Sequence, residues 1–168
     1  MMGAQHTLAA GRREPTRLAL RAGLILGVGV VGTLDQVVLH EMLQWHTFYV
    51  HTTQYWRLFI DGIFHVVTAS LLCLGAALLW EWRHRLSVVR DARALAAGIL
   101  FGMGGFQLFD GIVDHKVLQI HPVREGVDNL LPYDAAFLTV AVALLLVGWL
   151  LWRGIRSRDA GLPGTGGT

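Results

Sequence analysis

Long apolar runs without charged side chains divide the chain into segments. Residues 62–80 and 135–152 contain no Asp, Glu, Lys or Arg. A membrane-spanning helix needs roughly 17–25 mainly apolar residues, so each of these two runs is long enough to cross a bilayer. Two further runs, 22–34 and 94–109, each stop at an aspartate and are too short by themselves. They reach spanning length only if that aspartate lies inside the membrane.

The pattern therefore predicts an all-α integral membrane protein with four transmembrane helices. We expect these helices at about 18–45, 57–82, 92–120 and 132–152. Pro122 limits the third helix, and Pro132 suits the first turn of the fourth. The helices form one domain, 18–153, between an N-terminal tail, 1–17, and a Gly-rich C-terminal tail, 154–168, that we expect to be disordered.

Basic residues are concentrated on one side of the predicted membrane domain. Eleven of the fourteen precede the first helix, join the second to the third or follow the fourth, which leaves Arg57, Lys116 and Arg124 on the other side. The positive-inside rule then places both termini in the cytoplasm. No small-x-small cleavage site follows the basic N-terminus, so the first helix is expected to remain as an anchor. We expect the plasma membrane of a bacterium as its location.

Composition agrees with a membrane protein and excludes other classes. Hydrophobic residues make up 54 % of the chain and charged residues only 15 %, against about a quarter in soluble domains. The basic excess is too small to indicate a nucleic-acid partner. Cys73 is the sole cysteine, which excludes an intramolecular disulfide and a thiol-based zinc motif. The expected partner is the lipid bilayer, and a homo-oligomer or another envelope protein is compatible with the sequence.

The chain contains an internal repeat. Residues 22–46 and 97–121 are identical at ten of 25 positions at an offset of 75, where chance gives about two. Each repeat is a two-helix hairpin, at about 18–82 and 92–153, and both hairpins insert in the same direction. We therefore expect a four-helix bundle with a pseudo-two-fold axis along the membrane normal. The repeated Gly-x-x-x-Gly stripes, Gly23/Gly27 and Gly98/Gly102, predict close packing of the first and third helices.

A polar motif recurs in both repeats, in the half of the helices away from the basic side. It reads Asp35…His40…Gln44…His46 in the first copy and Asp110…His115…Gln119…His121 in the second. The other helices add polar residues at the same depth. Together the candidate metal ligands are Asp35, His40, Asp61, His65, Asp110, Asp114, His115 and Asp134. We assign His46, His51 and His121 mostly to structural positions in outer loops or at the interface.

Aspartates inside a membrane need a compensating positive charge. One aspartate costs about 2.5–3.5 kcal/mol at the bilayer centre, and several in adjacent helices repel one another. A bound transition metal, protonation or the few outer basic residues can supply that charge. Carboxylate and imidazole are ligands for Zn, Fe, Mn and Cu, which this pattern does not distinguish.

Helix geometry leaves the ligand sets open. Residues five apart on an α-helix differ by about 140° in direction, so Asp35 and His40 cannot both bind one ion from a regular helix. Either a π-bulge brings them together, or they face different neighbours. Asp61 and His65, four residues apart, are spaced for one ion, and so are Asp110 and Asp114.

These motifs resemble a known family. The strings Gly32-Thr-Leu-Asp35 through His46, Asp61-Gly-x-Phe-His65 and Phe109-Asp-Gly-Ile-Val-Asp-His115 are similar to an uncharacterised bacterial four-span membrane protein family, domain of unknown function 2243. The similarity covers about residues 17–153. It implies a small four-span membrane protein with repeated Asp and His, and it implies no particular activity.

Several functions are compatible with this sequence. The leading hypothesis is an Asp/His cluster, open to the periplasmic or extracellular side, that binds one or two transition-metal ions for redox, hydrolytic or metal-handling chemistry. A second is a haem b electron carrier with His40 and His115 as axial ligands, against which the clustered acids count. A proton or cation pathway and a metal-free assembly protein are further alternatives. Whether the protein is an enzyme is left open.

Overall fold

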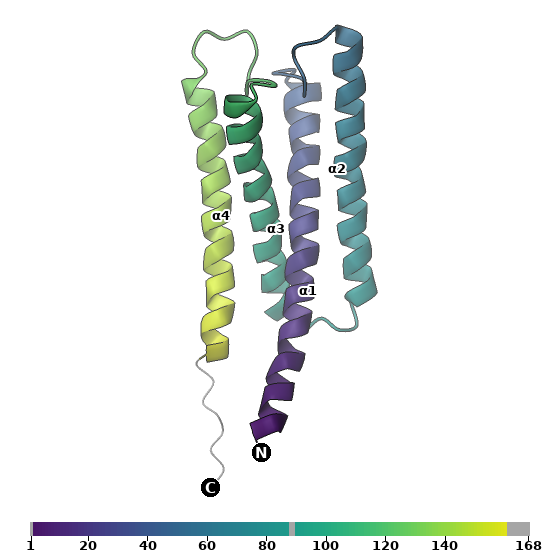
Figure 1. Ribbon diagram of the computed structural model, residues 1–168, viewed down its shortest axis with the longest axis vertical. Helices are drawn as coiled ribbons and strands as arrows, with labels where there is room; N and C mark the ends of the chain where they lie inside the picture. Colours follow the sequence, from purple (N-terminus) through teal and green to yellow (C-terminus); the bar gives the residue numbers. More distant parts are fainter. Residues whose placement is uncertain (1, 88–89, 161–168) are drawn as a thin grey trace.

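The computed structural model describes residues 2–87 and 90–160, and every regular element within these ranges is a helix. Two π-helices directly continue the first and third α-helices (Figure 1). Four stretches are long and apolar enough to cross a membrane, as predicted: Glu14–Met42, Gln54–Trp82, Arg90–Val117 and Leu131–Arg156. The elements are α1 (Met2–Asp35), η1 (Gln36–Met42), α2 (Gln54–Trp82), α3 (Arg90–Phe109), η2 (Asp110–Val117) and α4 (Leu131–Ala160).

The helices stand side by side with α1 and α3 in the centre (Figure 1). Helix α2 packs on α1, and α4 packs on α3. The start of α1 and the end of α4 lie at one end of the molecule, and the π-helices lie at the other end with the loops 43–53 and 118–130. The outer helices bury little of their surface within the chain, which leaves broad apolar faces for lipid.

Two helices extend further than predicted. Helix α1 already begins at Met2, within the expected N-terminal tail, and α4 continues to Ala160. Residues 154–160, expected to be disordered, are therefore helical, and residues 161–168 lie outside the described ranges. Arginines near the C-terminal end of α4, such as Arg153 and Arg156, favour its continuation because cations interact well with that end of the helix dipole.

Glycines hold α1 and α3 at close contact, which confirms the predicted packing. A Cβ atom on Gly27 would lie 3.0 Å from the Cα of Gly102 and would overlap the carbonyl oxygen of Ile99. The same holds for Gly23, whose added Cβ would lie 3.0 Å from the Cα of Gly98. The two backbones are thus too close for any larger side chain, and this contact fixes the position of η1 relative to η2.

Backbone hydrogen bonds join the two loops at the polar end. The N–H of Val50 donates to the carbonyl of Ile120 (3.2 Å), and the N–H of Glu125 donates to that of Trp45 (2.6 Å). Arg57 at the start of α2 reaches across to both carboxylate oxygens of Glu125, each at 3.1 Å. The loops therefore form a cross-linked cover over the ends of η1 and η2.

Candidate metal centre

The π-helices bring each aspartate next to the histidine five residues later. A π-helix has more residues per turn than an α-helix, so residues five apart come onto one face. The Nε2 atom of His40 lies 3.3 Å from Oδ2 of Asp35, and that of His115 lies 3.1 Å from Oδ2 of Asp110. Of the two arrangements left open by the sequence, the structure has the π-helical one, and it has it twice.

Both π-helices end in the same way. The N–H groups of Leu43 and Leu118 donate to the carbonyls five residues earlier, Val38 (2.9 Å) and Val113 (2.7 Å). The next residue in each copy, Gln44 or Gln119, has φ of 51°, in the left-handed region. This turn reverses the chain and directs the residue two positions later back toward the helix ends.

The residues that the turns direct inward are His46 and His121, which the sequence analysis assigned to structural loop positions. They are 3 % and 2 % exposed, and each completes a group with an Asp–His pair. Triad 1 is Asp35, His40 and His46; triad 2 is Asp110, His115 and His121. Within each triad, one ligand atom from every residue lies within 4.8 Å of the others. This separation is compatible with three ligands around one metal ion.

The two triads adjoin one another through their imidazole rings. The ring centroids of His40 and His46 are 4.4 Å apart, and those of His115 and His121 are 4.7 Å apart. His46 and His121 stack between these pairs at 4.6 Å with a tilt of 13°. The four rings thus form a continuous row that links both triads into one centre.

Hydrogen bonds on the outer side of three rings direct their Nε2 atoms inward. The Nδ1 atom of His46 donates to the carbonyl of Val123 (2.8 Å), and that of His121 donates to the carbonyl of Phe48 (2.9 Å). A carbonyl can only accept, so Nδ1 carries the proton and Nε2 keeps its lone pair. Such a partner on the far nitrogen is the usual arrangement around a metal-ligating histidine.

Asp61 of α2 bonds the outer nitrogen, Nδ1, of His40. Its Oδ1 accepts from Nδ1 of His40 (3.2 Å) and from the N–H of Phe48 (2.7 Å). The inward Nε2 atom of His46 and the Nδ1 atom of His115 are buried without a hydrogen-bond partner. The Nε2 atoms of His40 and His115 are also buried and face only the aspartate of their own triad, at 3.3 and 3.1 Å, outside hydrogen-bond geometry. Buried polar atoms are almost always paired, so these nitrogens without hydrogen bonds mark the row of rings as a candidate ligand site.

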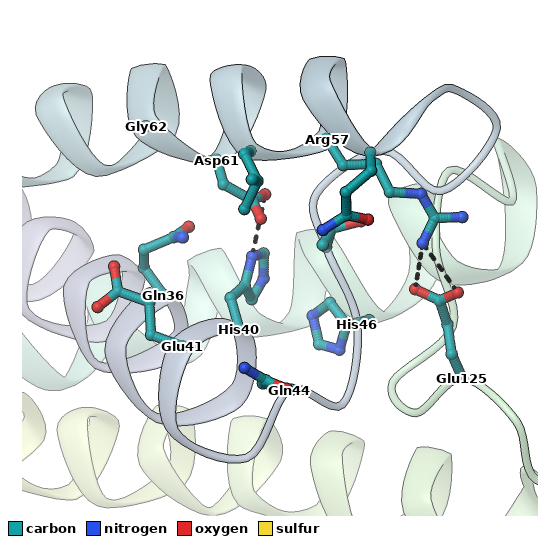
Figure 2. A pocket seen from close by; sticks show the side chains of 12 residues that line it. Gln36, His40, Glu41, Gln44, His46, Arg57, Asp61, Gly62 and Glu125 are labelled. Carbon is teal, nitrogen blue, oxygen red and sulfur yellow. Dashed lines mark hydrogen bonds and ion pairs between the residues drawn. The ribbon is translucent and has the colours of Figure 1, made fainter.

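A polar cavity of about 610 Å³ reaches triad 1 from the side of α2 (Figure 2). His40, His46 and Asp61 line it, and the Arg57–Glu125 ion pair stands at its edge (Figure 2). Water and small polar solutes can therefore reach the His40 and His46 side chains from the side of α2.

Burial keeps the two loop histidines neutral. It lowers the pKa of His46 from its ordinary 6.5, and it lowers the pKa of His121 to about 2, in both cases with help from neighbouring imidazoles. Neutral imidazole is the form that binds a metal ion, so both side chains are ready to bind at pH 7.

These low pKa values predict that the metal-free protein loses stability in acid. Below pH 6.5 the unfolded chain binds protons that folded His46 and His121 do not, so the free energy of unfolding falls as pH falls. The expected slope is about 1 kcal/mol per pH unit for His121, and His46 adds a contribution of the same sign. Thermal denaturation of chelator-treated protein between pH 7.5 and 4.5 measures it. A variant with both histidines replaced by asparagine should show a flatter profile, and an equal slope in both would contradict this assignment.

Comparison with known proteins gives one match. A family profile described as predicted membrane protein (DUF2243) matches residues 22–155. The chain belongs to this family. The chain has no significant match among curated proteins or among solved structures.

The matched region of this DUF2243 chain contains all eight predicted ligands, and the structure separates them into three groups. Four of them, Asp35, His40, Asp110 and His115, belong to the triads. Two lie directly behind a triad residue: Asp61 bonds His40, and Asp114 is buried beside Asp110. The remaining two face elsewhere.

The outlying pair consists of His65 and Asp134. His65 faces Glu41 at 3.7 Å in a partly exposed position, whereas Asp61 bonds His40, and neither belongs to a triad. Asp134 forms an ion pair with Lys116. The sequence repeat offered a signal for His46 and His121, because they are identical residues at the same offset of 75 as Asp35/Asp110 and His40/His115.

Proposed function

We propose that this membrane protein binds two transition-metal ions, one in each triad, at adjoining sites. The observation that carries the proposal is that one ligand atom from each residue of a triad lies within 4.8 Å of the other two, in both triads, while Nδ1 of His40, His46 and His121 is bonded on the outer side. Two aspartates supply negative charge to offset part of the charge of the ions. The same aspartates then have the counter-charge that their place inside the membrane requires.

The ligand chemistry favours iron or zinc. Each triad offers two imidazoles and one carboxylate, the set typical of non-haem iron(II) sites and also common for zinc. The centre has no thiolate, and Cys73 is exposed on α2, so copper(I) is disfavoured. Three protein ligands leave coordination positions open, which suits redox or hydrolytic chemistry, or transfer of the metal to another envelope protein.

Reciprocal contacts support the proposed pseudo-two-fold relation between the hairpins. His46 donates to Val123 while His121 donates to Phe48, and these two carbonyls are also 75 residues apart. The contact between Gly27 and Gly102 joins equivalent residues as well. The positive-inside pattern of the basic residues supports cytoplasmic termini. We therefore place the proposed metal centre, at the opposite end of the helices, on the periplasmic side of the bacterial plasma membrane.

The arrangement of the rings argues against haem b. A porphyrin between His40 and His115 would need an open slot, yet His46 and His121 stack there, in contact with both. The outer nitrogen of His40 is held by Asp61, which fits a ligand to a small ion equally well.

Metal analysis of the purified protein tests the proposal. After anaerobic reconstitution with Fe(II), Zn(II) or Mn(II) and removal of excess metal, we expect about two bound ions per chain, the number of triads. The matched control is His84→Ala, since His84 is an exposed histidine in the loop after α2. Less than a tenth of an ion per chain with all three metals would contradict a metal centre. It would favour a proton pathway, tested by proton flux in liposomes, or a purely structural role for the cluster.

A further inference from the structure

Helices α1, α3 and α4 enclose an apolar groove of about 800 Å³ on the lipid-facing surface. Its lining on α4 runs from Pro132 to Leu144, so the groove extends for about 18 Å at 1.5 Å of helix rise per residue. Val31 and Met103 contribute apolar side chains from α1 and α3. The groove therefore lies along the membrane normal and can be entered from the bilayer.

Two polar side chains from the central helices interrupt this apolar lining. One is Asp35, whose side chain is 11 % exposed and which also belongs to triad 1. The other is Gln107 of α3, whose buried Oε1 atom has no hydrogen-bond partner. A carboxylate and an unpartnered amide oxygen are both acceptors, so a ligand that satisfies them must donate an O–H or N–H group.

Aromatic side chains surround these acceptors. Trp45, Tyr133 and Phe137 line the same groove, with the Trp45 and Tyr133 rings edge to face at 5.5 Å. The Arg124 guanidinium lies over both rings at 5.2 and 5.3 Å and donates to the Tyr133 hydroxyl (2.7 Å). These contacts hold rigid aromatic walls at the polar end, against which a flat ring can pack.

We infer that the groove binds a membrane-soluble phenol, an aromatic ring with a hydroxyl head and an apolar tail. The hydroxyl donates to Asp35 or Gln107, the ring packs among the aromatic walls, and the tail follows α4 toward Leu144. This inference rests on the proposed function in one respect: Asp35 is both a groove residue and a candidate metal ligand, so the hydroxyl is placed beside the metal of triad 1.

The position of the groove gives triad 1 two different approaches. Asp35 is reached from the lipid side, whereas His40 and His46 are reached from the polar cavity on the side of α2. A lipid-borne substrate and water-soluble species can therefore meet the same triad from different phases. A centre that acts on a phenolic substrate drawn from the bilayer uses both approaches.

Photocrosslinking in lipid nanodiscs tests this inference. The probe is 4-decylphenol with a diazirine in its alkyl tail, and mass spectrometry locates the adducts in metal-free and metal-loaded protein. We expect adducts on groove residues of α4 such as Val140 and Leu144, in both forms. Unlabelled 4-decylphenol should compete about tenfold better than its methyl ether, as expected for the loss of one well-formed hydrogen bond of about 1.4 kcal/mol.

A pair of neighbouring alanines supplies the matched variants. Ala136 is exposed and lines the groove, so Ala136→Trp fills it and should reduce specific labelling at least tenfold. Ala135→Trp, on the next residue of α4, should retain labelling because Ala135 is exposed and is not part of the lining. Gln107→Leu should weaken the advantage of the phenol over its ether while the adducts stay in the groove.

Three outcomes would overturn the inference. Adducts spread evenly over the exposed faces of α2 and α4, or labelling unaffected by Ala136→Trp, would show that the groove has no specific ligand. Competition by 1-hexadecanol as strong as that by the phenol would show that it accepts a lipid alcohol instead. Since labelling is measured without metal, absence of metal binding in the parent protein contradicts the proposed function alone and leaves this test intact.

Discussion

Replacing both His46 and His121 with asparagine is expected to weaken metal binding severely. Asparagine places its amide nitrogen where the imidazole has Nδ1, so the hydrogen bonds to Val123 and Phe48 can persist while both Nε2 ligands are lost. Each triad then keeps only two ligands. We expect the affinity for Fe(II) or Zn(II) to fall by about two orders of magnitude or more, beyond the 10–100-fold typical of losing a supporting residue. Equilibrium dialysis against a competing chelator measures it.

The control for this variant is His51→Asn, which alters an exposed histidine in the same loop as His46. His51 bonds the carbonyl of Gln119 through Nε2 and belongs to neither triad. It should bind metal as the parent does. Unchanged affinity in the double variant would show that the triads are not the binding site.

Variants with a single aspartate replaced distinguish two separate metal sites from one shared site. If each triad holds its own ion, Asp35→Asn and Asp110→Asn should each lose about one equivalent and keep the other, because the two triads share no residue. A loss of all metal in both variants would indicate one shared ion or a strongly coupled pair.

Adding a single methyl group at Gly27 is expected to destabilise the fold severely. The new Cβ would overlap the Ile99 carbonyl oxygen, a backbone atom that can move only if α1 and α3 separate. We expect Gly27→Ala to cost about 3 kcal/mol, at the upper end of overpacking effects. Thermal denaturation in detergent measures the loss. The separation also moves η1 from η2, so the ring contact between His46 and His121 should weaken and metal affinity should fall.

Gly105 provides the matched control for that glycine. It is also inside a central helix, but nothing lies within 4 Å of a Cβ placed there, and it is exposed. Gly105→Ala should therefore be neutral or stabilise the protein by about 0.5–1 kcal/mol, the helix-propensity gain of alanine. Equal destabilisation by both substitutions would show that the close contact of α1 and α3 does not govern stability.

The number and place of the helices could be read from the sequence because they depend on local composition. Helices long and apolar enough to cross a membrane are found at all four predicted positions, although α1 and α4 extend further at the basic end. The glycine contact was predictable too, since Gly23/Gly27 and Gly98/Gly102 lie on regular α-helix, where spacing alone fixes the shared face.

The grouping of the candidate ligands was only half predictable because it depends on departures from regular helix. Spacing left open whether a π-bulge joins Asp35 to His40 or they face different neighbours, and the structure has the π-helical arrangement, with Asp61 bonded to His40. His46 follows a left-handed turn at Gln44, and no periodicity extends through such a turn. We assigned His46 to a structural loop position because the first helix ends before it.

The sequence by itself determined that this chain has four helices long and apolar enough to cross a membrane, repeats a polar motif, and brings Asp and His together at one end. Those properties follow from hydropathy, residue identity and an offset of 75, all of which are local or directly comparable along the chain. Only the tertiary structure decided which side chains meet. Two π-helices and two reversed loops, held together by backbone hydrogen bonds between residues far apart in the sequence, turn the repeated motif into adjoining triads. Such contacts depend on the packing of α1 against α3, which no single segment encodes.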